Sequence, residues 1–149
     1  MKNKVLIAID LDDDYLYVIK KGFELAKAMD AKVILTSIVN IYVNYIQPDV
    51  STSPIQWDEV YNAQVEFTTQ ELNKIKSQNN NLEIEVYIEK GNSKTAIIDK
   101  ANDENVNYIV MGTHGRTGIS QIFMGSTAEY IIRHSTKPIL VIPMNTLKH

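Results

Sequence analysis

The sequence contains no cysteine, and this absence removes several classes of protein at once. Without a thiol there is no disulfide scaffold, no thiolate metal site and no cysteine nucleophile. Apolar runs are short, and none reaches the roughly 18 residues that a membrane-spanning helix needs. Lys and Arg number 15 against 18 Asp and Glu, a net charge of -3, so no basic face predicts nucleic-acid binding. The apolar stretch after Lys4 is too short for a signal peptide, and we expect a cytoplasmic protein.

What the sequence does contain is a regular alternation of short apolar runs and helix-forming segments. Its 149 residues, 44% of them hydrophobic, predict one domain over 1–149 with a sizeable core. Runs rich in β-branched residues predict buried strands, and helical spacing of apolar residues predicts helices between them. The predicted strands are Val5–Ile9, Val33–Val39, one within Leu82–Ile88, Tyr108–Met111 and Ile139–Ile142. This order predicts an α/β fold with a mostly parallel sheet that helices cover on both faces.

The same periodicity assigns helix starts and inner faces. Residues 40–56 have no clean period and are predicted to form a long loop. The helix predicted over Asp58 to Lys76 turns one side inward, with Val60, Ala63, Phe67, Leu72 and Ile75. Ser93 is predicted to cap the next helix. The last helix is predicted to point Ala128, Ile131 and Ile132 inward.

A cluster of glycines directly follows the fourth predicted strand. Four of the six glycines fall within 14 residues: Gly112, Gly115, Gly118 and Gly125. Glycine lets a backbone approach a ligand closely, and clustered backbone N–H groups can hold a phosphate. Parallel sheets bind ligands at the carboxyl ends of their strands, and the helix that Ser126 opens attracts anions at its N-terminus. These features favour a phosphate site over a plain flexible loop. Residues 126–129 also have the form of a capping box, a role that is compatible with phosphate binding.

Acidic residues follow the first predicted strand. Carboxylates can hold Mg²⁺ together with a substrate's phosphates, but acids also favour helix N-termini. We assign helix capping to Asp12, Asp13 and Asp14. Asp10, at the strand end, is the candidate to face a ligand and a metal ion, Mg²⁺ or Mn²⁺. The three histidines share no metal-site spacing, and neither a P-loop nor a nucleophile elbow is present.

The glycine spacing carries a resemblance to a known family. Gly112-Thr113-His114-Gly115, followed after nine residues by Gly125-Ser126, resembles the G-x2-G-x9-G-(S/T) signature of ATP-binding universal stress proteins. The segments around it, Ala8-Ile9-Asp10 and Gly91 resemble the family too, so that only residues 40–80 stand outside the resemblance. Two positions depart from the family's usual pattern. Asp12 stands where a small residue or Ser is usual, and Asn107 stands where Asp is usual.

The resemblance implies a fold, a ligand and a set of binding residues. The implied fold is a three-layer, adenine nucleotide alpha hydrolase-like sandwich with a five-stranded sheet in the order 3-2-1-4-5. The implied ligand is ATP, or AMP or ADP, bound between the first and fourth strands. By position the binding residues are Asp10, Ile38, Gly112, Thr113, His114, Gly115, Arg116, Gly125, Ser126 and Thr127. The glycines and Ser126 would hold phosphates and ribose, Asp10 would lie beside adenine and ribose, and Ile38 would contact adenine.

We therefore expect a nucleotide-binding regulatory module of the stress response that is not an enzyme, because nothing in the sequence supplies both a base and a positioned water. The rival function is a slow ATP hydrolase or phosphotransferase that uses Asp10 and a divalent metal. A phospho-receiver domain would need a phosphoacceptor Asp at a central strand end, and none is well placed. A dimerisation module without ligand is a further alternative.

The last predicted strand also predicts an assembly. The predicted order puts the uncharged, apolar run Ile139–Ile142 at a sheet edge, which proteins normally pair, charge or cover. A symmetric homodimer through this strand is the expected solution. The alternative is that the tail from Met144 to His149 folds over the edge.

Overall fold

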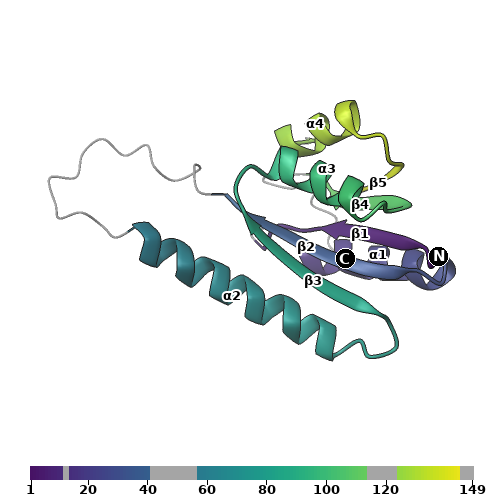
Figure 1. The fold of residues 1–149 in the computed structure, drawn as a ribbon, viewed down its shortest axis with the longest axis horizontal. Helices are drawn as coiled ribbons and strands as arrows, with labels where there is room; N and C mark the ends of the chain where they lie inside the picture. The colour runs from purple at the N-terminus through teal and green to yellow at the C-terminus, as the bar shows by residue number, and fades with distance from the viewer. Residues whose placement is uncertain (12–13, 41–56, 114–123, 145–149) are drawn as a thin grey trace, which may run out of the picture.

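The computed structural model describes residues 1–11, 14–40, 57–113 and 124–144. Within these residues five parallel strands alternate with helices, and the sheet order is β3-β2-β1-β4-β5 (Figure 1). The strands are β1 (Lys4–Ala8), β2 (Lys32–Val39), β3 (Ile84–Lys90), β4 (Tyr108–Gly112) and β5 (Ile139–Ile142). The helices are α1 (Tyr15–Ala28), α2 (Trp57–Ser77), α3 (Ser93–Asp103) and α4 (Ser126–His134). The predicted fold class and strand order are confirmed.

Two hydrophobic layers lie on opposite faces of the sheet. Alternate residues of a strand point to opposite faces, so β1 contributes Val5 and Ile7 to one layer and Leu6 to the other. The first layer packs against α1 and α2, and the second packs against α3 and α4. Figure 1 shows α3 and α4 together above the sheet, with α2 along its lower side. Both faces of the sheet are therefore covered, as an all-parallel sheet requires.

The inner side of α2 differs from the predicted one. Leu72 and Ile75 are buried as expected, but Val60 is 54% exposed, Phe67 is 57% exposed and Ala63 is also exposed. The side that faces the sheet also carries Tyr61 and Thr68. Thr68 tolerates burial because its hydroxyl donates to the carbonyl of Gln64 at 2.8 Å. Thr68, whose hydroxyl is hydrogen-bonded within its own helix, thus lies on the inner side, where the prediction had placed Val60, Ala63 and Phe67.

The predicted interior of α4 is wrong at one position. Ala128 and Ile131 are buried, whereas Ile132 is 42% exposed. Consecutive helical residues lie about 100° apart, so a short helix that packs through Ala128 and Ile131 turns Ile132 partly away.

No helix among the described residues combines the length and the apolar content that crossing a membrane requires.

The start of α3 lies one residue from the predicted cap. Asn92 is the N-cap, and its side-chain oxygen accepts a hydrogen bond from the N–H of Lys94 at 2.9 Å. Ser93 is the first helical residue, so its predicted capping role is wrong. At α1 the N-cap is Asp14, whose side chain makes no capping hydrogen bond. Asp12 and Asp13 lie outside the described residues.

The amino ends of β1 and β4 are joined by side-chain and backbone bonds. Asn107 accepts from the N–H of Lys4 through its side-chain oxygen at 2.8 Å, and its own N–H donates to the carbonyl of Lys4 at 2.8 Å. An amide oxygen accepts this bond as a carboxylate would, which accounts for Asn at a position where Asp is usual in the resembled family. Glu104 accepts from the ammonium groups of Lys4 at 2.9 Å and Lys100 at 3.0 Å. Asn107, in place of the usual Asp, therefore makes both hydrogen bonds with Lys4 that join the amino ends of β1 and β4.

Candidate functional site

The carboxyl ends of three neighbouring strands meet at the predicted site. β1 lies between β2 and β4 and pairs with both in register up to Ala8. Asp10 lies two residues beyond Ala8 and is exposed, while Ile38 and the pair Gly112–Thr113 lie at similar heights on the two neighbours. Adjacent strands are about 4.8 Å apart, so the register places these positions side by side. Four of the predicted binding residues therefore share one edge of the sheet.

The N-terminus of α4 supplies a second group of predicted residues. Gly125 is the N-cap, with φ 79° and ψ 153°, a conformation essentially reserved for glycine. Its carbonyl accepts the first helical bond, from the N–H of Glu129 at 3.1 Å. The remaining N–H groups of the first turn have no partner within the helix, and the N-cap Gly125 has no side chain that could accept from them. Such an end presents backbone donors and positive helix-dipole charge to an anion.

The capping-box interpretation of residues 126–129 is wrong. Ser126 is the first helical residue rather than the cap, and Gly125 occupies the capping position without a side chain. The Glu129 carboxylate accepts instead from the guanidinium of Arg133 at 2.7 Å. Ser126 is exposed. Of its two sequence-based roles, the phosphate contact is the one that stays as a prediction.

Thr127 connects the first turns of α4 and α3. Its hydroxyl lies 3.2 Å from the hydroxyl of Ser93, and either oxygen can donate. The contact brings the N-terminal ends of two helices to one place. Sequence reasoning did not pair these two residues because 34 positions separate them. Thr127 is half-buried in this arrangement, so its hydroxyl has a protein partner whether or not a ligand is bound.

Thr113 lies at the point where the predicted loop leaves β4. It is 4% exposed, and its N–H donates to the carbonyl of Ile142 at 2.9 Å. Its hydroxyl accepts from the N–H of Met144 at 2.8 Å. A hydroxyl that accepts one bond can still donate another, so this contact leaves Thr113 able to donate to a ligand.

Three of the predicted binding residues, His114, Gly115 and Arg116, lie outside the described residues, as does Gly118. The predicted metal ligand Asp10 lies in the described part of the chain. There, no group of three or more His, Asp or Glu side chains could hold a metal ion on its own. A single carboxylate fits a cation only when phosphate and water oxygens complete its shell. A metal at Asp10 would therefore depend on a bound nucleotide.

The comparisons with known proteins agree on one family. The model of the universal stress protein family matches residues 1–143. The chain belongs to the universal stress protein family. Universal stress protein MJ0531 of Methanocaldococcus jannaschii is 30% identical over 142 residues, which cover 93% of this chain and 81% of that protein.

Solved structures of other universal stress proteins share the fold. Protein MJ0577 of the same organism is 26% identical and superimposes with a TM-score of 0.73 over 95% of this chain and 96% of its own. A universal stress protein solved in complex with cAMP is 17% identical, with a TM-score of 0.64 over 96% of this chain and 98% of its own. At that identity the second comparison concerns the fold alone.

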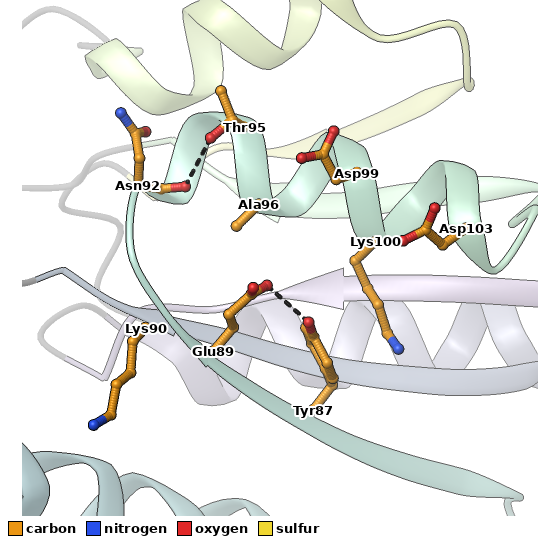
Figure 2. Close-up of a pocket in the computed structure, with 9 residues that line it drawn as sticks. All are labelled: Tyr87, Glu89, Lys90, Asn92, Thr95, Ala96, Asp99, Lys100 and Asp103. Carbon is orange, nitrogen blue, oxygen red and sulfur yellow. Dashed lines mark hydrogen bonds between the residues drawn. The ribbon is translucent and has the colours of Figure 1, made fainter.

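A separate cavity of about 310 Å³ lies between β3 and α3 of this universal stress protein. Figure 2 shows Tyr87 and Glu89 rising from β3 beneath α3, with Lys100 reaching down from the helix. Among the described residues, none of the predicted nucleotide-binding residues lines it. The described lining residues are Tyr87, Glu89, Lys90, Asn92, Thr95, Ala96, Asp99, Lys100 and Asp103. No sequence motif predicts this cavity, because it forms only where α3 packs over β3.

Many polar groups of the cavity bind one another. The Tyr87 hydroxyl donates to Glu89 at 2.7 Å, and that hydrogen bond, together with burial and the charge of Glu89, raises the pKa of Tyr87 to about 12. The ammonium of Lys100 lies 3.9 Å from the centre of the Tyr87 ring and also binds Glu104. Thr95 donates to the carbonyl of Asn92 at 3.4 Å (Figure 2). Of these contacts, the one between Lys100 and the Tyr87 ring joins α3 to β3, whereas the others lie within a single element or its caps.

Proposed function

We propose that this protein binds an adenine nucleotide, ATP in the first place and otherwise ADP or AMP, at the carboxyl edge of β1 and β4. The observation that carries the proposal is the start of α4. Gly125 begins the helix in a conformation that favours glycine, it has no side chain to cap the helix, and the first-turn N–H groups lack partners within the helix and can donate to a phosphate. Gly125 is also the last glycine of the signature found in the sequence.

The rest of the edge suits the other parts of a nucleotide. Asp10 is a hydrogen-bond acceptor for ribose hydroxyls, and Ile38 offers apolar contact to a base. Ile38 packs against the layer beneath α3 and α4, so a rigid part of the fold holds it. His114, Gly115 and Arg116 remain part of the proposal as residues of the phosphate loop.

The proposed role is regulatory binding in a single domain, residues 1–149, rather than catalysis. Hydrolysis needs a base and a water held in line with the phosphate. Asp10 is exposed and lies two residues beyond β1, and it is the group on which the rival function, slow hydrolysis with a divalent metal, depends. We expect turnover far below the roughly 10 s⁻¹ that is typical of enzymes.

Mass spectrometry of small molecules released from freshly purified, denatured protein tests the ligand directly. An adenine nucleotide at close to one per chain is the expected result, and calorimetry with added ATP should then show saturable binding to emptied protein. Absence of both would refute the proposal. Steady-state phosphate release near the typical enzyme rate, lost in Asp10→Asn, would move the function to the hydrolase.

We also propose a symmetric homodimer through β5. The strand lies at the end of the sheet, Leu140 is 37% exposed, and Ile139 and Val141 are half-buried. Met144, the first residue of the tail that could cover this edge, instead packs into the core beside Val18. A second copy of β5 related by a two-fold axis would pair the open edge.

Light scattering of Val141→Lys tests the dimer. A buried lysine on the pairing edge should give monomers, whereas Leu16→Lys, at an exposed apolar residue of α1, should leave the mass unchanged. An unmodified protein that is monomeric at micromolar concentration would refute the interface.

A further inference from the structure

The end of β4 is tied to the chain that follows β5. Thr113 donates its N–H to Ile142 at 2.9 Å and accepts the N–H of Met144 through its hydroxyl at 2.8 Å. Thr113 and Met144 are 4% and 7% exposed, so water does not compete for these bonds. The two hydrogen bonds hold Thr113 through both its backbone and its side chain.

The Met144 side chain explains why position 112 holds glycine. A Cβ added to Gly112 would lie 2.6 Å from Cγ of Met144 and 3.0 Å from Cγ2 of Val18 in α1. Real Cβ atoms essentially never come closer than 3.0 Å to another heavy atom, so any side chain here would displace Met144. Packing inside the protein therefore requires the first glycine of the signature before any ligand is considered.

From these contacts we infer that Thr113 and Met144 are positioning residues of the proposed nucleotide site. They hold the backbone at Gly112–Thr113, the point from which the glycine loop departs, against the end of β5. Nucleotide affinity then depends on a residue that follows β5 in the sequence and that carries no group suited to binding phosphate. The inference rests on the proposed function, and it adds a physical connection between that site and the last strand.

The energetic reason is preorganisation. A backbone that is already held in place loses less conformational freedom when a ligand binds, so the ligand binds more tightly. Removing the Thr113 hydroxyl leaves the buried N–H of Met144 without its acceptor, an unfavourable state that the protein can relieve by loosening this contact. A loosened backbone must then be ordered when the nucleotide binds, and this ordering weakens the binding.

The competing explanation is that the Thr113 hydroxyl touches the nucleotide itself. That explanation makes Thr113 important and Met144 irrelevant, whereas positioning requires both. Thr113→Val keeps the shape of the side chain and removes the hydroxyl, and Thr113→Ser keeps the hydroxyl. Met144→Ala removes the packing, and Met144→Leu largely preserves it. Thr68→Val is the matched control, since it removes another buried, hydrogen-bonded hydroxyl at a distance from the site.

ATP titration by calorimetry on these variants tests the inference. Thr113→Val and Met144→Ala should each weaken ATP binding on the order of tenfold, the equivalent of about 1.4 kcal/mol. Thr113→Ser and Met144→Leu should bind close to the unmodified protein, and Thr68→Val should lose thermal stability without losing affinity. Weaker binding in Thr113→Val alone would indicate direct contact with the nucleotide and overturn the positioning role. Unchanged affinity in both Thr113→Val and Met144→Ala would also overturn the positioning role.

Hydrogen exchange without nucleotide separates this inference from the proposed function. The Thr113 amide, bonded to Ile142, should exchange faster in Thr113→Val and Met144→Ala than in Thr68→Val. If the unmodified protein fails to bind ATP, the proposed function falls, and the exchange rates still decide whether the two residues hold the end of β4. Equal exchange in all variants would overturn that contact's role.

Discussion

The two ends of the sheet are built from different kinds of contact. At the amino end, charged and amide side chains join β1 to α3 and neighbouring strands to each other: Glu104 binds two lysines, Asn107 binds the backbone of Lys4, and Lys32 binds Glu85 at 2.7 Å. At the carboxyl end of β4 and the start of α4, the described contacts of Thr113, Gly125 and Thr127 use backbone N–H groups and hydroxyls. At the amino end the polar side chains bind one another and the backbone, whereas at the carboxyl end the first-turn N–H groups of α4 have no partner within the helix.

Under the proposed function, the amino end contributes to stability and the carboxyl end of β1 and β4 contributes to binding. Two ion pairs share the Glu104 carboxylate, and the one with Lys4 joins β1 to the end of α3. A glycine-capped helix end leaves donors that a ligand can complete. Substitutions at the carboxyl end should therefore change binding most, and substitutions at the amino end should change stability and leave binding intact.

Gly125→Val is expected to have the largest effect. Valine resists a φ of 79°, at a strain cost of about 1–3 kcal/mol, and its side chain would occupy the space in front of the first turn of α4. ATP binding measured by calorimetry should be abolished while the protein stays folded by circular dichroism.

Gly91→Val is the control for strain alone. Gly91 also has a positive φ, 139°, and lies in open space after β3. This variant should lose a similar amount of stability and still bind ATP. Unchanged ATP affinity in a folded Gly125→Val variant would remove α4 from the site and erase the contrast between the two ends.

Removal of divalent cations should have an intermediate effect. Phosphate charge beside Asp10 is unfavourable by about 1 kcal/mol for unit charges 4 Å apart in water, which a shared Mg²⁺ or Mn²⁺ would offset. We expect ATP to bind about fivefold more weakly in EDTA than in Mg²⁺. Asp10→Asn should bind nearly equally in both. Equal affinity in the unmodified protein would place Asp10 away from the phosphates.

Glu104→Gln should have the smallest effect, at the amino end. Hydrogen bonds from Lys4, and secondly from Lys100, hold the pKa of Glu104 below its ordinary 4.5. A carboxyl whose pKa is lower in the folded state stabilises the protein above about pH 4.5, and this contribution is lost as pH falls through the folded pKa. The variant should therefore be less stable by about 1 kcal/mol at pH 7 and equally stable in acid.

Chemical denaturation at pH 7 and below pH 4 measures this difference. Glu24→Gln, which removes an exposed pair with Lys21 on α1, should change stability little at either pH. ATP affinity should be unchanged in both variants. A binding defect in Glu104→Gln would show that the two ends of the sheet are coupled.

Strands were the part of the fold that sequence could predict best. Short apolar runs such as Val33–Val39 have one stable location, the middle of a covered parallel sheet, so their pattern predicts both strand and burial. Helices were harder because an apolar residue on a helix can lie beside the buried face rather than on it. Val60 and Phe67 are examples, and Thr68 was overlooked because its hydroxyl is satisfied locally.

The candidate site was predicted as a set of positions and not as a set of contacts. The glycine spacing predicted which residues gather, and the register of β1 with β2 and β4 places Asp10, Ile38 and Gly112 at one edge. The spacing could not reveal that Met144 fills the space above Gly112, or that Ser93 meets Thr127. Such contacts depend on how distant segments pack, and no local pattern records them.

The central place of β1 has a consequence for how the protein is made. Val5, Leu6 and Ile7 are completely buried, yet Val5 pairs on one side with Tyr108, which leaves the ribosome only after most of the chain has been synthesised. Until then the edge of β1 that pairs with β4, apolar from Val5 to Ala8, lacks its partner, and unpaired edges of this kind promote aggregation. We therefore expect the growing chain to be prone to aggregation until β4 has been synthesised.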